Sequence, residues 1–143
     1  MKVLFLDIDG VLNSRRSAIA FNGYPSILDE NEDKFDKVAV ELIKRVCSQG
    51  VSIVLSSTWR LDKNFKKILG LPIIDRTESL SGKCRGEEIQ KWLDKNKVDK
   101  WAIIDDDSDM LDSQIKNFAH VDGKNGIMWA DYENLCKILD VTA

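Results

Sequence analysis

Two aspartates separated by a single residue are the first feature of this sequence that could do chemistry. Asp7 and Asp9 follow an unbroken apolar run at residues 3–6. Such a run is typical of a strand buried in a parallel sheet, and alternate side chains of a strand share one face. The two carboxylates would therefore crowd together where the chain turns at Gly10, and a bound Mg²⁺ would relieve their repulsion and desolvation. Taken alone, the pattern fits an acidic turn equally well.

Three further polar groups lie beside predicted elements of secondary structure. They are the hydroxyls of residues 56–58, the cations Lys83 and Arg85, and the aspartates among residues 105–109. Each group is a weak signal alone, but the carboxyl ends of parallel strands share one edge of a sheet, where ligands bind. Together they would supply carboxylates for a metal, a nucleophile, donors for an oxyanion, and a cation. This set meets the requirements of phosphoryl transfer, which are positioning and charge neutralisation.

The elements that must position these groups alternate between strands and helices. Apolar runs predict strands at residues 3–6, 51–55, 72–75, 101–104 and 118–121. Helical spacing predicts helices at residues 35–46, 62–69, 86–96 and 132–139, the first of them capped by Asp33. This alternation predicts an α/β fold, a three-layer sandwich with a central parallel sheet. Residues 11–33 are polar and irregular, and they predict a flap rather than a second domain.

Size, charge and cysteine content are those of a small globular domain. The length of 143 residues predicts one domain, residues 1–143, with a single core. A net charge of −3 gives no general attraction to nucleic acid or anionic membranes, and no apolar run is long enough to span a bilayer. The three cysteines lack C-x-x-C spacing and indicate neither a disulfide framework nor a zinc site. No signal peptide precedes the first predicted strand, so we expect a cytoplasmic protein.

The sequence leaves no room for a large insertion over the predicted site. Only the flap at residues 11–33 fits after the first strand, and residues 61–82 are mostly needed for a helix and a strand. Large inserted caps close over small metabolites and exclude water. An uncapped cleft suits a large phosphorylated substrate such as a nucleic-acid end, or requires another subunit to close it. The acidic composition argues mildly against tight polymer binding, so nucleotides and sugar phosphates remain alternative substrates.

The four motifs, in this order, resemble those of the haloacid dehalogenase (HAD) superfamily of phosphatases. The resemblance lies in residues 6–12, residues 55–58, Lys83 or Arg85, and residues 103–106. Three stretches also resemble a compact group of HAD domains that accompany RNA-repair modules or resemble the phosphatase half of polynucleotide kinase-phosphatases. These stretches are residues 57–60, 85–93 and 104–109. The resemblance implies a HAD-like Rossmannoid fold without a large cap domain, and hydrolysis of phosphomonoesters that depends on Mg²⁺.

The resemblance also implies catalytic roles for particular residues. Asp7 would attack phosphorus and form an aspartyl-phosphate, which divides the hydrolysis into two steps. Asp9 would protonate the leaving oxygen and then deprotonate the attacking water. Ser56 would form a hydrogen bond with the transferring phosphoryl group. No Lys-Pro pair marks the third motif, so either Lys83 or Arg85 would neutralise charge beside Asp7, with Lys83 slightly favoured.

Mg²⁺ is the cofactor that the resemblance implies. Its ligands would be Asp7, the backbone carbonyl of Asp9 and one later aspartate. Asp106 is the first choice for that position. Asp105 and Asp109 are rivals, because three consecutive aspartates leave the alignment open.

Substrate contacts are predicted for four residues near the motifs, namely Gly10, Ser57, Arg60 and Arg85. An arginine can grip a phosphate with two donors or stack on a base. For Arg60, an exposed side chain beside a buried Trp59 is an equally good interpretation.

A second class of function also gathers aspartates and a lysine at the edge of a parallel sheet. Receiver-like signalling modules are phosphorylated there but turn over slowly. Their phosphorylated aspartate normally leaves a different strand from the metal-binding pair, whereas Asp7 and Asp9 leave the same predicted strand. A phosphatase is therefore the leading hypothesis and a receiver-like module the alternative. A catalytically silent homologue is disfavoured, because the set of site residues is intact.

Overall fold

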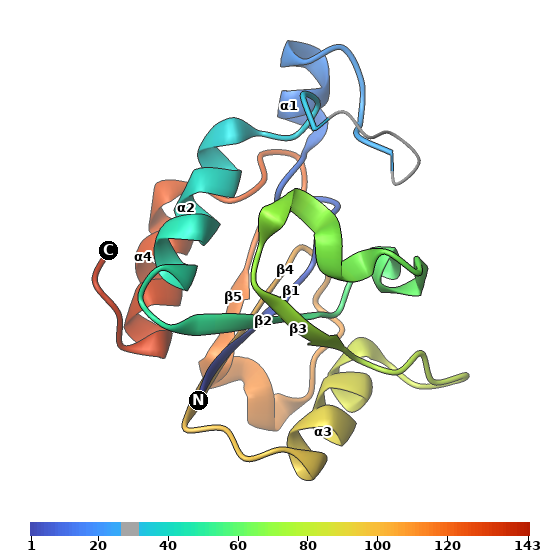
Figure 1. Ribbon diagram of the computed structural model, residues 1–143, viewed down its shortest axis with the longest axis vertical. Helices are drawn as coiled ribbons and strands as arrows, with labels where there is room; N and C mark the ends of the chain where they lie inside the picture. The colour runs from blue at the N-terminus through green and yellow to red at the C-terminus, as the bar shows by residue number, and fades with distance from the viewer. Residues whose placement is uncertain (27–31) are drawn as a thin grey trace.

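A parallel sheet of five strands lies at the centre of the computed structural model, which describes residues 1–26 and 32–143 (Figure 1). The strands are β1 (Lys2–Leu6), β2 (Val51–Leu55), β3 (Ile73–Arg76), β4 (Lys100–Asp105) and β5 (Phe118–His120). Their order across the sheet is β3-β2-β1-β4-β5, and every pairing is parallel. The central place of β1 explains its unbroken apolar run, because both of its faces are covered.

The α-helices of the described chain are α1 (Arg15–Ala20), α2 (Lys37–Cys47), α3 (Arg85–Lys95) and α4 (Trp129–Leu139). Leu4 and Leu6 of β1 belong to one hydrophobic cluster with the inner faces of α2 and α4. Val3 and Phe5 alternate with them and pack on the opposite face with Ile89 of α3. The resulting three layers, visible in Figure 1, confirm the predicted α/β sandwich. None of these helices is long and apolar enough to cross a membrane.

Two local predictions about helices are wrong. Asp36, and not Asp33, caps α2, because its carboxylate accepts hydrogen bonds from backbone N–H groups of the first turn. No α-helix forms over residues 62–69, where the backbone is partly 3₁₀ and is interrupted at Leu69, which adopts a φ of 55°. The 3₁₀ helices are η1 (Thr58–Leu61), η2 (Phe65–Gly70) and η3 (Asp112–Asn117).

The flap predicted at residues 11–33 is less irregular than expected. Ser14 and Ser17 form a capping box at the start of α1, which lies in this segment. Residues 27–31 of the predicted flap lie outside the described part of the chain.

The register of the sheet aligns the ends of three strands. Leu6 of β1 pairs with Leu55 of β2 on one side and with Ile104 of β4 on the other. The residue that follows each partner therefore lies at the same level along the carboxyl edge. These residues are Asp7, Ser56 and Asp105.

Candidate active site

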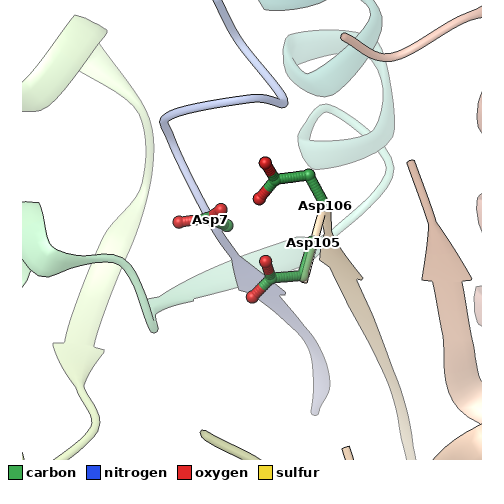
Figure 2. A group of neighbouring side chains, drawn as sticks. All are labelled: Asp7, Asp105 and Asp106. Atoms are coloured by element: carbon green, nitrogen blue, oxygen red, sulfur yellow. The ribbon is translucent and has the colours of Figure 1, made fainter. Parts of the chain in front are cut away.

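Three carboxylates meet at the carboxyl edge of the sheet (Figure 2). One oxygen from each of Asp7, Asp105 and Asp106 lies within 4.8 Å of the others. Asp7 and Asp105 are buried, while Asp106 is exposed. The structure thus brings together three predicted site residues that come from opposite halves of the sequence.

Two glycines make room for Asp106 in this cluster. Gly10 has a φ of 85°, which glycine adopts readily, and a Cβ at this position would overlap the Asp106 carboxylate. A Cβ on Gly123 would lie 2.5 Å from Asp106 Oδ2. The N–H of Gly10 donates to Asn13 Oδ1 at 3.1 Å, so this amide is used inside the loop and not for the predicted substrate contact.

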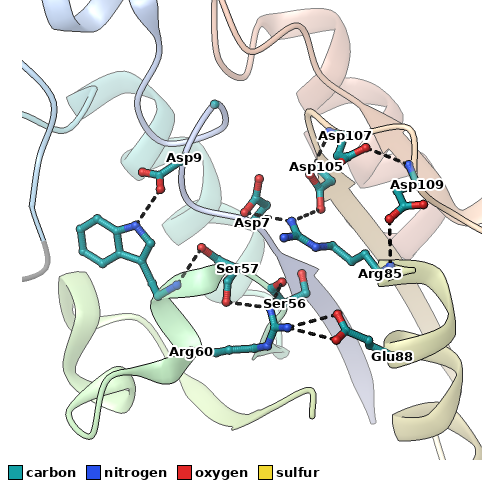
Figure 3. A network of polar contacts seen from close by, with 12 residues as sticks. Asp7, Asp9, Ser56, Ser57, Arg60, Arg85, Glu88, Asp105, Asp107 and Asp109 are labelled. Carbon is teal, nitrogen blue, oxygen red and sulfur yellow. Dashed lines mark hydrogen bonds and ion pairs between the residues drawn. The ribbon is translucent and has the colours of Figure 1, made fainter. Parts of the chain in front are cut away.

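Arg85 is the cation that reaches the carboxylates. Its Nη1 lies 2.8 Å from Asp105 Oδ2 and 3.3 Å from Asp7 Oδ1 (Figure 3). Lys83 is exposed and forms no ion pair with any residue that the structure describes. The structure therefore places Arg85 beside Asp7, although the sequence slightly favoured Lys83.

A close contact at the start of α3 brings Arg85 to the cluster. The N–H of Gly86 donates to Asp109 O at 2.9 Å, and a Cβ on Gly86 would lie only 2.6 Å from Leu111 N. The N–H of Arg85 donates to the Asp109 carboxylate at 3.2 Å. Asp109 thus binds the first turn of α3, and its carboxylate, unlike those of Asp105 and Asp106, lies outside the cluster.

The cluster carries more negative charge than Arg85 balances. Burial, followed by the Asp105 carboxylate, raises the pKa of Asp7 to about 9, and Arg85 opposes this shift. Asp106 is exposed as a residue, but partial desolvation of its carboxylate likewise raises its pKa. Burial by itself would lower the pKa of Arg85, but the carboxylates of Asp105 and Asp7 outweigh it and raise that pKa. Asp7 therefore needs a further cation nearby to stay ionised, and nucleophilic, at neutral pH.

The hydroxyl of Ser56 is buried without a hydrogen-bond partner. The residue is fully buried and its N–H donates to Leu6 O at 3.1 Å, yet its Oγ has no partner in the described chain. An unmade buried hydrogen bond costs about 1–3 kcal/mol, so nearly all buried polar groups are paired. Because the register places Ser56 level with Asp7, an oxygen of a group bound at Asp7 would complete this hydrogen bond.

Asp9 lies apart from the three clustered carboxylates. Its Oδ2 accepts a hydrogen bond from Trp59 Nε1 at 3.1 Å, the dashed line at Asp9 in Figure 3. Its Oδ1 accepts one from Asn13 Nδ2 at 2.9 Å. The side chain is exposed and free of ion pairs with the described residues. A metal contact through its backbone carbonyl remains a prediction.

Comparison with known protein families identifies the relatives of this domain. The family of the HAD domain in Swiss Army Knife RNA repair proteins matches residues 3–132. The chain belongs to this family. The match includes every site residue described above, and it confirms the predicted resemblance. No curated protein and no solved structure matches the chain.

Membership of this HAD family implies a hydrolase or phosphatase, and HAD domains typically use Mg²⁺. The geometry of this chain fits such a cation. Carboxylate oxygens are the ligands that Mg²⁺ prefers, and three of them lie together here. The raised pKa of Asp7 indicates that Arg85 alone does not neutralise the cluster, and two glycines leave room for the Asp106 carboxylate beside it. Asp7 and Asp106, with Asp105, could hold the ion.

In this HAD domain the side chain of Arg60 is turned into the protein. Arg60 is 5% exposed, and its Nη1 donates to Ser56 O at 2.8 Å and to Ser57 O at 3.0 Å. Its Nη2 donates to both carboxylate oxygens of Glu88, at 3.1 and 3.3 Å (Figure 3). Glu88 also accepts a hydrogen bond from Leu80 N at 2.7 Å. The predicted substrate contact is thus absent from this arrangement, because both terminal nitrogens of Arg60 are bound to acceptors of the protein.

No pattern in the sequence indicated the contacts of Asn13 and Glu88, or the hydrogen bond between Trp59 and Asp9. Ser57 Oγ accepts the N–H of Trp59 at 3.2 Å and caps η1, and the predicted substrate contact of Ser57 stays a prediction. Hydrophobic spacing and motif order carry no information on these side-chain contacts. The available signal was the resemblance of residues 57–60 and 85–93 to compact HAD domains. These two stretches contain Arg60 and Glu88, which form the ion pair.

Proposed function

We propose that this HAD domain hydrolyses phosphomonoesters through an aspartyl-phosphate on Asp7, with Mg²⁺ as cofactor. The observation that carries the proposal is the surroundings of Asp7. Its carboxylate is buried beside two further carboxylates and the guanidinium of Arg85. It lies level with the hydroxyl of Ser56, which has no hydrogen-bond partner among the described residues. Phosphoryl transfer requires this combination of a nucleophile, positive charge and hydrogen-bond donors around one point.

In the first step, an oxygen of Asp7 would attack phosphorus while the bond from phosphorus to the leaving oxygen breaks. Asp9 would give its proton to that oxygen, so that a neutral alcohol leaves. Arg85 and Ser56 would hold the non-bridging oxygens, on which the negative charge is spread. The products of this step are the alcohol and the phosphorylated Asp7.

In the second step, water would attack the same phosphorus and give a proton to Asp9 as the bond to Asp7 breaks. Inorganic phosphate leaves, and Asp9 again carries the proton that the first step consumed. Asp7 and Asp106, together with Asp105 or the backbone carbonyl of Asp9, would hold Mg²⁺. When bound, the ion supplies charge neutralisation at the phosphoryl oxygens.

A terminal phosphate of a nucleic acid is the substrate that we propose first. The occurrence of this family in RNA repair proteins supports it. The open carboxyl edge of the sheet also supports it, because no second domain covers this edge within the described residues. Phosphates of small metabolites are the second candidate, because a net charge of −3 gives the domain no general attraction for a polyanion.

Release of phosphate from p-nitrophenyl phosphate in the presence of Mg²⁺ tests the reaction. We expect turnover that EDTA abolishes and that Asp7→Asn lowers at least about 10³-fold, because an amide is a poor nucleophile. Asp112→Asn removes an exposed carboxylate outside the cluster and is the matched control, which should keep its activity. Incorporation of one phosphoryl group without turnover would instead support the receiver-like alternative.

The substrate class is tested separately with oligonucleotides that carry a 3′- or a 5′-phosphate, with nucleotides and with sugar phosphates. We expect the highest kcat/KM for one type of oligonucleotide end. A higher kcat/KM for a sugar phosphate would contradict the nucleic-acid substrate and leave the phosphatase reaction standing.

A further inference from the structure

Both oxygens of the Asp9 carboxylate are held by side chains that are themselves buried. Trp59 Nε1 donates to Oδ2 at 3.1 Å, and Asn13 Nδ2 donates to Oδ1 at 2.9 Å. Asn13 is fully buried and Trp59 is 8% exposed, whereas Asp9 is exposed. A carboxylate at the surface is thus oriented by two donors from the interior.

Other contacts keep the two donors in place. The Trp59 ring packs against Phe35 with ring centroids 5.5 Å apart, and its backbone N–H donates to Ser57 Oγ at 3.2 Å. The Asn13 amide has a defined orientation, because its Oδ1 accepts the N–H of Gly10 at 3.1 Å and its Nδ2 must therefore face Asp9. Asp9 consequently meets donors that are already ordered.

The chemistry of these donors decides where a proton on Asp9 can point. An indole N–H and an amide NH₂ can only donate, so neither can accept a proton from a carboxyl group. A carboxyl group has about four lone-pair sites, and the two hydrogen bonds occupy one site on each oxygen. The proton of Asp9 must therefore occupy one of the sites that these two donors leave free.

We propose that Trp59 and Asn13 are positioning residues that direct the proton of Asp9 toward the leaving oxygen of the substrate. The inference rests on the proposed function, in which Asp9 protonates that oxygen as its bond to phosphorus breaks and Asp7 bonds to phosphorus. The same orientation serves the second step, where Asp9 takes a proton from water as the bond from phosphorus to Asp7 breaks. Orientation of an acid in this way requires no contact between Trp59 and the substrate.

Trp59→Phe tests the inference, because it keeps an aromatic ring beside Phe35 and removes the N–H along with part of the indole. The readout is kcat/KM, in Mg²⁺, for a series of aryl phosphates whose leaving phenols differ in acidity. Proton donation matters most for the least acidic phenols, so misdirection of Asp9 should harm those substrates most. We expect a loss of about tenfold for phenyl phosphate and of no more than about twofold for p-nitrophenyl phosphate.

Trp92→Phe is the matched control. Trp92 is also 8% exposed, and its Nε1 donates to a carboxylate, Asp75 Oδ2, at 2.8 Å. This pair joins α3 to β3 and has no contact with Asp9 in the described chain. We expect Trp92→Phe to change kcat/KM by the same factor for every aryl phosphate, or not at all.

Asn13→Asp is the second test, and it keeps the acceptor for the Gly10 N–H while removing the donor to Asp9. It should also make kcat/KM depend more steeply on the acidity of the leaving phenol. The inference alone would be overturned if the wild-type protein turns over substrate and both variants, Trp59→Phe and Asn13→Asp, lose the same factor in kcat/KM for every aryl phosphate. No loss in either variant would overturn it as well. Absence of any turnover by the wild-type protein would overturn the proposed function, and the inference with it.

Discussion

Two arginines lie near the carboxyl edge of the sheet, Arg60 buried and Arg85 half-buried, and their surroundings differ. Arg60 pairs with one buried carboxylate, Glu88, and donates to two backbone carbonyls. Arg85 faces two carboxylates, Asp7 and Asp105, and a third lies within the same cluster. Burial lowers the pKa of Arg60 despite Glu88, whereas the two carboxylates outweigh burial and raise the pKa of Arg85.

The difference lies in the balance of charge, which is even around Arg60 and uneven around Arg85. Around Arg60 one positive charge meets one negative charge, and the pair joins the backbone after β2 to α3. Around Arg85 negative charge is in excess, and the hydroxyl of Ser56 lacks a partner among the described residues. Because Ser56 follows β2 and Arg85 begins α3, the Arg60–Glu88 pair holds together the two elements that carry them.

The largest effect on stability is expected from breaking the balanced pair. Arg60→Gln would leave Glu88 buried with an uncompensated charge, so the free energy of unfolding should fall by about 3–5 kcal/mol. The double variant Arg60→Met, Glu88→Leu removes both charges and should recover most of this loss. Urea denaturation measures both changes. An Arg60→Gln protein as stable as the wild type would show that the pair does not hold these elements together.

A smaller effect, on activity, is expected at the unbalanced site. Arg85→Gln should lower kcat/KM for p-nitrophenyl phosphate about 10²-fold in Mg²⁺, since it removes a charge-bearing donor beside Asp7. Lys83→Gln removes the neighbouring exposed cation and should change kcat/KM by less than about twofold. A larger loss of kcat/KM in Lys83→Gln than in Arg85→Gln would instead assign the cation of the third motif to Lys83, the residue slightly favoured from the sequence.

The third effect concerns the dependence of stability on pH without metal. The pKa of Asp7 is raised from 3.8 to about 9 by burial and then by Asp105. The folded protein therefore binds this proton more tightly than the unfolded chain. The resulting stabilisation is fully present below the unfolded pKa of 3.8 and is lost as pH rises through the folded pKa of about 9. In EDTA, the Tm should fall as pH rises from about 5 to about 9, and the fall should be weaker in Asp7→Asn.

Mg²⁺ provides the control for this pH experiment. At alkaline pH it should raise the Tm of the wild-type protein by a few degrees, because it binds only the folded cluster, and raise that of Asp7→Asn much less. A Tm that rises with pH in EDTA, or an equal response of both proteins to Mg²⁺, would contradict the assignment of excess negative charge to this cluster.

Much of the fold and part of the site could be predicted from the order of local patterns. The apolar run of β1 and the polar residues after each strand are properties of short segments. They were sufficient to indicate a parallel sheet with Asp7, Ser56 and Asp105 at one edge. Predictions failed where several local conformations compete, as at residues 62–69, where 3₁₀ turns replace the expected helix.

By itself, the sequence determined which groups arrive at the carboxyl edge, because strand pairing in register carries the residue after each strand to the same level. Only the tertiary structure decided which way the long side chains point there. Arg85 reaches Asp7 because Gly86 permits α3 to approach Leu111, and Arg60 turns inward because Glu88 lies within hydrogen-bond distance. These are contacts between distant segments, and their geometry depends on packing that no local pattern encodes.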